Sequence, residues 1–366
     1  MNKKNIFLIL ISILIIFSII AVVGTFLFNN QSNISIEPKG EVSISVTGDV
    51  MFGRKMPSVL SSNESPYRYV ANVTNKSDIL LVNFENPVTN SGTSYKGDVP
   101  LKSSPEYVSL VKGANITVCA LANNHAFDYG QVGMNDTLNY LNQIGAYHIG
   151  AGPNVNNASA PVTLHTNGRT ITILNFMDSN NFAEYSQEVM PKATVNSSGY
   201  SAYNETLAAQ EIQNAKNNGS DYVIVFMHYG NEYSRSPNEA QMNISHQCID
   251  NGADIVLGSH THVTQGVEMY KGKPIFYNLG NFVFDQSNTA THRAYFVNIH
   301  LVNNTAEVTM YPVNLIGYLP HFMSPEDGTE LLKELNPQCS NVTITPEGTG
   351  KLVYNLTKNN TSSKFF

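Results

Sequence analysis

The sequence predicts an α/β fold in which a mainly parallel sheet with flanking helices packs against a second, more antiparallel sheet. Three observations lead to this prediction. Short apolar runs alternate with helix-like stretches through the first two thirds of the chain, as in βαβ units. Two pairs of runs are separated by hairpin turns. Strands of alternating pattern then follow towards residue 312.

The parallel sheet is predicted from apolar runs that have the length of strands and end in polar residues. These runs are 42–46, 79–83, 116–121, 170–176, 222–227 and 255–257, with helix-like stretches at 104–112, 131–143, 205–217 and 238–251. Because parallel strands need a long crossover, often a helix, this alternation favours parallel pairing.

The second sheet is predicted from hairpin signals. Asn167-Gly168 separates 162–164 from 170–176, and an Asn-Gly pair favours a tight two-residue turn. Lys271-Gly272-Lys273 separates 267–270 from 275–277 in the same way. The alternating strands 294–301 and 306–312 would complete this sheet.

The N-terminus is expected to be a membrane anchor. Lys3 and Lys4 precede an apolar run from Ile6 to Phe28, which exceeds the roughly 20 residues that a helix needs to cross a bilayer. A basic flank stays on the cytoplasmic side, so the bulk of the chain is expected outside the cytoplasm of a single-pass membrane protein. The alternative is a cleaved signal peptide, whose apolar part would be shorter, about 7–15 residues.

The predicted organisation has four parts. The anchor occupies 1–28, a polar linker 29–40, one large domain 41–318 and a C-terminal extension 319–366. The 366 residues suffice for one large domain with appendages. Within the extension, 325–335 has the pattern of a helix.

Net charge, missing sequence motifs and cysteine spacing argue against several classes of protein. The net charge of −7 and the lack of an arginine cluster argue against nucleic-acid binding. GxGxxG, P-loop and GxSxG motifs are absent, which excludes dinucleotide oxidoreductases, P-loop NTPases and serine hydrolases. Cys119, Cys248 and Cys339 lack the spacing of a metal site, and Cys119 and Cys248 fit buried hydrophobic positions.

The surface is expected to be glycosylated. Only 13% of residues are charged, against roughly 25% in an average domain, and Asn, Ser and Thr supply the remaining polarity. Asn-x-Ser/Thr sequons recur, among them Asn72, Asn115, Asn196, Asn243, Asn341 and Asn355. Such sequons are acceptors for glycans on extracytoplasmic proteins.

Candidate metal ligands follow the predicted strands, and ligands of open α/β sheets bind outside the carboxyl ends of strands. These residues are Asp49, Glu85, Asn124, His228, His260 and His262. Carboxylate, amide and imidazole groups suit divalent ions such as Mn, Fe, Zn or Mg, and there is too little cysteine for thiolate ligation. The sequence therefore predicts a site for one or two divalent ions.

Asn124-His125 is the most specific local signal. The amide oxygen of Asn124 can serve as a neutral ligand, while His125 would act as an acid on the leaving group. Asp128 lies three residues further on and would hold the imidazole of His125 in one tautomer.

Other positions leave alternatives open. Asp49 could cap a helix instead of binding a metal. Glu85 could bind a metal, act as an acid or base, or be solvated at the sheet edge. Arg54 could bind an anionic substrate oxygen or form a surface ion pair. Asn281 could support the site or form a turn.

These motifs together resemble the CapA family, the poly-γ-glutamate capsule-synthesis proteins within the calcineurin-like metallophosphoesterase superfamily. The resemblance runs from about Val42 to Leu315. It lies in GDVMFGR at Gly48, NFENP at Asn83, ANNHAFDYG at Ala122, GAGPN at Gly150, HYGNEY at His228, GSHTHVTQ at Gly258 and YNLGNFVFDQ at Tyr277. It implies an α/β/β/α sandwich and two metal ions bridged by a carboxylate.

The resemblance also implies roles for single residues. Asp49 matches the first-strand aspartate, His125 the catalytic histidine, and Glu85 falls where the superfamily has its bridging aspartate. Asn124, His228, His260 and His262 match the remaining ligands. Met51 departs from the pattern, because the superfamily has a histidine there and a thioether cannot replace imidazole for such ions. One of the two metal sites is therefore expected to be weak or missing.

Two functions follow from the resemblance. The first is a role in the biosynthesis or export of poly-γ-glutamate or a related surface polymer, with membrane-bound synthesis proteins as partners. The second is a metal-dependent phosphoesterase that acts outside the cell, with His125 as the acid. The substrate would be an anionic polymer in the first case and a phosphoester in the second.

Overall fold

The computed structural model describes Asn2 and residues 39–61, 64–97, 99–182, 186–335 and 342–356, with only the backbone at 181 and 182. The described chain from Lys39 onward belongs to one compact unit. The apolar run of the predicted anchor, nearly all of the linker, Cys339 and Asn341 lie outside the described residues. No helix within the described ranges has the length and apolarity to span a bilayer.

The first sheet contains ten strands in the described chain. Its parallel half consists of β1 (Val42–Val50), β2 (Ile79–Phe84), β3 (Ile116–Ala120) and β4 (Tyr147–Ile149). Its other half is antiparallel and consists of β14 (Arg293–Val302), β15 (Thr305–Ile316), β16 (Leu319–Phe322), β17 (Thr343–Ile344) and β18 (Gly350–Asn355). The short β13 (Asn281–Val283) lies parallel to the end of β1.

The second sheet has the order β11-β12-β10-β9-β7-β6. These strands are β6 (Val162–Thr166), β7 (Arg169–Met177), β9 (Tyr222–His228), β10 (Ile255–Ser259), β11 (Val267–Tyr270) and β12 (Lys273–Phe276). The four central strands are parallel and the two edge strands pair through hairpins. Both predicted hairpins are confirmed, and Asn167 and Gly168 both have positive φ, as a tight turn of this kind requires.

The division of strands between the sheets differs from the prediction. The strands expected to form a separate antiparallel sheet, β14 and β15, instead join β1 in the first sheet. The parallel strands are split, because β7, β9 and β10 form the centre of the second sheet. The pattern of apolar residues identifies a strand and its buried faces, but it does not identify the neighbouring strand.

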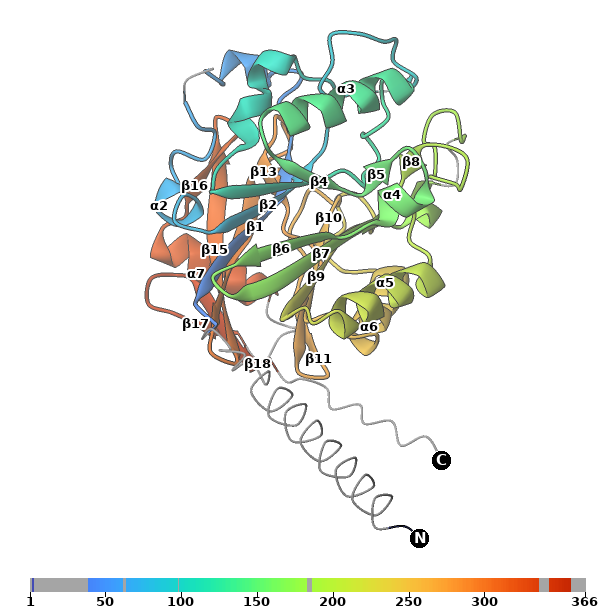
Figure 1. Cartoon of the computed structure of the whole chain (residues 1–366). Coiled ribbons are helices and arrows are strands. Elements are labelled where there is room, and N and C mark those ends of the chain that lie inside the picture. Colours follow the sequence, from blue (N-terminus) through green and yellow to red (C-terminus); the bar gives the residue numbers. More distant parts are fainter. Residues whose placement is uncertain are drawn as a thin grey trace. The chain divides into compact units, whose positions relative to one another are not determined.

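The described chain has six α-helices, most of which lie on the outer faces of the two sheets, whereas the last of them packs against the cluster between the sheets (Figure 1). They are α2 (Ala71–Thr74), α3 (Gly130–Gln143), α4 (Val155–Ser159), α5 (Glu205–Asn217), α6 (Glu239–Asp250) and α7 (Pro325–Leu335). Short 3-10 segments are η1 (Met56–Ser58), η2 (Pro105–Val111), η3 (Ser179–Phe182) and η4 (Thr289–His292). The helix-like stretch at 104–112 is the 3-10 segment η2. A small two-stranded sheet joins β5 (Ala151–Gly152) to β8 (Gly199–Tyr200).

Three buried clusters hold the layers together. In β2, Leu81 belongs to the cluster between the sheets, while Leu80 and Val82 belong to the cluster beneath α3. The cluster between the sheets also includes Ile224 of β9. A third cluster places Ile212 of α5 against the far face of the second sheet. The described fold is therefore a mixed α/β sandwich of two sheets, with helices outside both.

The chain after residue 318 is part of this core. It contributes β16, α7, β17 and β18 to the first sheet and its packing, and α7 agrees with the predicted helix. The hydroxyl of Tyr354 in β18 is hydrogen-bonded to the hydroxyl of Tyr222 in β9. This buried contact joins the two sheets near the start of β9.

Candidate metal centre

Polar residues at the carboxyl ends of five strands meet at one end of the sandwich. In the first sheet, Asp49 lies near the end of β1, Glu85 directly follows β2, and Asn124 follows β3. In the second sheet, His228 ends β9 and His260 directly follows β10. All are buried. Parallel strands bring their carboxyl ends to one edge, which explains why distant segments converge here.

Asp49, Glu85 and His228 form the centre of the cluster. They can each offer a ligand atom such that all three atoms lie within 4.8 Å of one another. Asn124 Oδ1 lies 2.9 Å from His228 Nε2. His262 Nδ1 lies 3.1 Å from Asp49 Oδ2. The ring centroids of His260 and His228 are 4.6 Å apart. The structure thus brings together all six residues that the sequence predicted as ligands.

Two buried oxygens of this cluster, Asp49 Oδ2 and Glu85 Oε1, accept no hydrogen bond within the described chain. Asp49 Oδ2 does lie in ion-pair contact with His262 Nδ1 at 3.1 Å. His262 Nδ1, the nitrogen beside Asp49 Oδ2, is within hydrogen-bond distance, 2.9 Å, of Asn281 Oδ1. Buried carboxylate oxygens without partners are unfavourable unless a cation compensates them. The residues present therefore fit a divalent ion.

Ser259 and Asn124 flank the two nitrogens of His228. The Ser259 hydroxyl lies 3.1 Å from His228 Nδ1 and 3.1 Å from the carbonyl of Met227. His228 Nε2 faces the cluster, 2.9 Å from Asn124 Oδ1. With the Ser259 proton on the Met227 carbonyl, Nδ1–H donates to Ser259 and the lone pair on Nε2 can bind an ion. This is the arrangement that orients an imidazole as a metal ligand.

Burial controls the charge states of the cluster. It raises the pKa of Glu85 well above its ordinary value, and the negative charges of Asp49 and Glu232 add to that effect. It lowers the pKa of His228 well below its ordinary value, as it does for His260, so these imidazoles are neutral and able to bind a metal. Burial also acts to lower the pKa of His262, but Asp49 outweighs it and the net shift is upward.

The backbone at the paired histidines is strained. His260 has a φ of 101° and His262 a φ of 61°, in a region that residues other than glycine rarely adopt. Such conformations persist only where the surrounding structure enforces them, and they concentrate at functional sites. These φ values show that the loop is not extended at either histidine.

His125 lies beside the ligands and is oriented by Asp128. Its Nδ1 donates to Asp128 Oδ2 at 2.6 Å, and the same oxygen accepts from the backbone of Leu101 at 2.7 Å. Its Nε2 lies 4.0 Å from Glu85 Oε1. Burial lowers the pKa of His125, while Asp128 acts in the opposite direction. The predicted pairing with Asp128 is present in the structure.

A cavity of about 480 Å³ opens beside His125 and His262. Arg54 lines it and forms an ion pair with the buried Asp285, with the guanidinium over the ring of Phe284. Of the two roles considered for Arg54, the structure shows the ion pair, which holds the side chain at the cavity wall. The wall also includes Lys55, Lys96, Val99, Glu232 and Tyr233.

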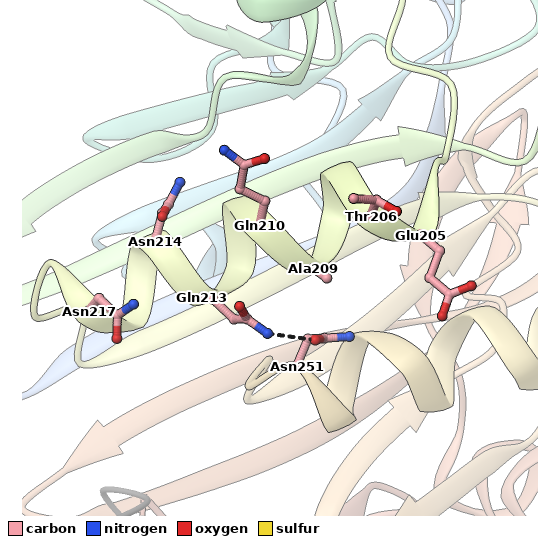
Figure 2. Close-up of a pocket in the computed structure, with 8 residues that line it drawn as sticks. All are labelled: Glu205, Thr206, Ala209, Gln210, Gln213, Asn214, Asn217 and Asn251. Carbon is pink, nitrogen blue, oxygen red and sulfur yellow. Dashed lines mark hydrogen bonds between the residues drawn. The ribbon is translucent and has the colours of Figure 1, made fainter. Parts of the chain in front are cut away.

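A second hollow bears no relation to the cluster. It has a volume of about 460 Å³ and lies along α5 and the end of α6. Figure 2 shows that amide side chains such as Gln210 and Asn214 line it, and that Gln213 is hydrogen-bonded to Asn251. None of the predicted site residues lines it.

The comparison with known families decides the classification. Residues 43–286 match the family described as "Bacterial capsule synthesis protein PGA_cap". The chain belongs to this family. The match spans β1 to β13 and therefore includes every strand end that contributes to the metal centre.

The chain is similar to proteins from several bacteria. The PGA biosynthesis protein CapA of Bacillus subtilis is 36% identical over 282 residues, which cover 75% of this chain and 72% of the relative. The capsule biosynthesis protein CapA of Bacillus anthracis is 33% identical over 285 residues, covering 75% and 68%. A probable polyglutamine synthesis accessory protein of Mycobacterium tuberculosis is 29% identical over 231 residues, covering 62% and 60%.

Solved structures resemble the chain more distantly. A hypothetical protein from Thermus thermophilus has a TM-score of 0.43 and 15% identity, covering 76% of this chain and 96% of that one. A sulfate thiohydrolase, SoxB, from the same species has a TM-score of 0.39 and 11% identity, covering 72% and 44%. Scores this low carry no argument about chemistry, which therefore rests on the residues of this chain.

The departure at Met51 has a structural explanation in this PGA_cap protein. Met51 is fully buried in the cluster beneath α3, and its sulfur accepts a hydrogen bond from the backbone of Gly53 at 2.8 Å. The side chain is thus engaged in the core.

Sequence reasoning missed three residues that contact the site. Asn83 donates to both carboxylates, Ser259 orients His228, and Lys96 lies 3.4 Å from the Nδ1 of His125. Asn83 and Ser259 stand inside recognised motifs, so a polar residue at a buried strand end was an available signal. Lys96 follows no pattern that the sequence reveals.

Proposed function

We propose that this protein acts in the biosynthesis or export of poly-γ-glutamate or a related anionic surface polymer, through a divalent-metal centre at Asp49, Glu85 and His228. The names of the Bacillus relatives support the polymer. The observation that carries the metal centre is the pair of buried carboxylate oxygens without hydrogen-bond partners beside a neutral imidazole. Mn, Fe, Zn and Mg all suit this ligand set.

The cavity beside the cluster is proposed to bind the anionic substrate. Arg54, Lys55 and Lys96 place three cations on its wall. Arg54 is held by Asp285, so its remaining N–H groups are fixed in position for a carboxylate or phosphate oxygen. Glu232 lies on the same wall and disfavours anions bound close to it.

In the proposed chemistry, the ion would activate the substrate oxygen or water, and the protein side chains would transfer a proton and orient the substrate. A divalent ion bound here would supply a Lewis acid that polarises a substrate oxygen and lowers the pKa of water. His125 would transfer a proton at Nε2, because its Nδ1–H is held by Asp128. Lys96 and Arg54 would orient the substrate in the cavity.

A metal-dependent phosphoesterase is the second candidate, favoured by the His125–Asp128 pair beside the ligands. His125→Ala is expected to lower Mn²⁺-dependent hydrolysis of p-nitrophenyl phosphate by about 10²–10⁴-fold, the usual contribution of a positioned acid. The measurement is steady-state turnover of purified protein, together with its bound Mn²⁺, which should not change. Equal turnover by the two proteins would contradict the phosphoesterase and leave the polymer role standing.

Membrane anchoring, an extracytoplasmic location and glycosylation form part of the same proposal. The basic and apolar N-terminal sequence supports the anchor. Every sequon asparagine in the described chain is exposed, whereas buried asparagines such as Asn83 and Asn281 are outside sequons. The exposed ones are Asn72, Asn75, Asn115, Asn135, Asn157, Asn196, Asn204, Asn218, Asn243, Asn303 and Asn355. Synthesis proteins in the same membrane are the proposed partners.

Deletion of residues 1–28 is expected to move the protein from the membrane fraction to the soluble fraction. The full chain should also be cleaved by protease added to intact spheroplasts, because its bulk would face outward. Glycans would raise the intact mass of protein from native cells above the 40.2 kDa of the sequence. Protection of the full chain from external protease would contradict the location.

A further inference from the structure

Asn83 is a buried amide between the two carboxylates of the cluster. It lies in β2, with 1% of its surface exposed. Its Nδ2 donates to Asp49 Oδ1 at 2.7 Å and to Glu85 Oε2 at 3.0 Å. One amide group therefore cross-links residues from the ends of two neighbouring strands.

The orientation of this amide is fixed by its partners. The amide of Asn123 donates to the carbonyl of Phe84 at 3.0 Å, so its nitrogen also faces the oxygen of Asn83, and the nitrogen of Asn83 faces Asp49 and Glu85. Its Oδ1 accepts from the side-chain nitrogen of Asn123 at 3.2 Å. The Oδ1 of Asn123 in turn accepts from the backbone of His125 at 3.2 Å. A chain of amides thus links the carboxylates to the loop that carries Asn124 and His125.

The amide uses one oxygen of each carboxylate and leaves the other free. Asp49 Oδ1 and Glu85 Oε2 bind Asn83, while Asp49 Oδ2 and Glu85 Oε1 are the two buried oxygens without hydrogen-bond partners in the described chain. Asn83 therefore fixes the rotation of both carboxylates. The two oxygens that Asn83 does not bind face a cation position beside His228, and one of them, Asp49 Oδ2, also lies 3.1 Å from His262 Nδ1.

The backbone of β2 does not require this side chain. Strand β2 pairs with β1 and β3 through its main chain, and the residues before Asn83 are the apolar Ile79–Val82. A buried amide in such a strand is unfavourable unless its hydrogen bonds compensate it. Three of the hydrogen bonds of Asn83 serve the carboxylates and Asn123.

We propose that Asn83 is the positioning residue of the metal centre, and that its amide holds Asp49 and Glu85 as a chelate for a single divalent ion. The inference rests on the proposed metal centre and adds two claims to it. One is the residue that aligns the carboxylates. The other is the stoichiometry, since Met51 supplies no imidazole and the amide already occupies one side of both carboxylates.

Asn83→Leu tests the positioning role, because leucine has a similar size and no hydrogen-bonding group. The full-length protein is titrated with Mn²⁺ by calorimetry, and its melting temperature is measured with chelator and with saturating Mn²⁺. The wild type is expected to bind one Mn²⁺ per chain. Asn83→Leu should bind about 10–100-fold more weakly, the usual effect of losing a group that orients ligands. Its Mn²⁺-induced rise in melting temperature should shrink accordingly.

Asn298→Leu is the matched control. Asn298 also cross-links strands through its amide, but it donates to Ser43, Ser45 and Ser77, and none of these contacts a ligand. A merely structural amide lowers the melting temperature equally with and without Mn²⁺, and this is expected for Asn298→Leu. Asn83→Ala serves as a second variant if the leucine variant does not fold.

The positioning role, the single-ion stoichiometry and the metal centre itself can each be contradicted by a different result. Equal Mn²⁺ affinity in wild type and Asn83 variants would overturn the positioning role. Two Mn²⁺ per wild-type chain would overturn the single-ion chelate. A wild-type protein that binds no Mn²⁺ would defeat the proposed metal centre itself, which is a different failure from the other two.

Discussion

Replacement of His228 by alanine is expected to lower the affinity for Mn²⁺ by at least about 100-fold, more than the loss of a group that only orients a ligand. The imidazole is neutral because it is buried, and its Nε2 faces the cluster while its Nδ1 lies 3.1 Å from Ser259. Without it, Asp49 and Glu85 remain as the only members of the three-residue centre. Equilibrium dialysis against Mn²⁺, followed by metal analysis, gives the affinity.

His246→Ala controls for the loss of an imidazole as such. His246 lies in α6, stacks on Tyr270 with centroids 3.8 Å apart, and pairs with Glu268 at 3.0 Å. None of these residues contacts the cluster, so Mn²⁺ affinity should equal that of the wild type. A His228→Ala protein that is folded and keeps its full Mn²⁺ complement would refute the proposed centre.

Gly48→Ala is expected to have the largest effect on stability among single methyl additions near the site. A Cβ at Gly48 would lie 1.7 Å from the carbonyl oxygen of Gly280, so the backbone of β1 or its neighbour must move. That carbonyl also accepts from the backbone N–H of Asp49 at 3.2 Å. Overpacking against main chain costs about 3 kcal/mol or more in the free energy of unfolding. Urea unfolding measures this change.

Gly97→Ala is the corresponding control. A Cβ at Gly97 would meet no atom within 4 Å. Its free energy of unfolding is expected to stay within about 0.5 kcal/mol of the wild type, as for most surface substitutions. If Gly48→Ala were equally harmless, the close approach of β1 to Gly280 would not exist in solution. The shift of Asp49 in that variant should also weaken Mn²⁺ binding.

Local sequence patterns predicted most of the elements, and long-range pairing accounts for what they missed. Apolar runs with polar ends indicated β2 and β9 because these strands are buried on both faces. The position of β14 beside β1 could not be predicted in this way, since residues about 250 apart in sequence form its pairs, as the contact of Ser43 with Asn298 illustrates. Alternation specifies a face and leaves the neighbour open.

For the candidate site, too, the sequence indicated individual residues but not the contacts between them. Asp49, Asn124 and His228 were identifiable because each stands at a strand end within a recognisable motif. Asn83 also stands in such a motif, but its role could not be predicted, because it depends on hydrogen bonds that form only when β1 and β2 pair. Chemistry carried by a single residue type is visible in sequence, whereas mutual orientation is a property of the folded chain.

The ligands come from both halves of the sandwich, and this has a mechanical consequence. Asp49 and Glu85 belong to one layer and His228 to the other, so a bound ion would clamp the layers at that end. At the far end of β9, Tyr222 and Tyr354 already tie them. Removal of the ion by a chelator would then separate the layers at the metal end only. Backbone amide hydrogen exchange should therefore accelerate first at the carboxyl ends of β1 and β9.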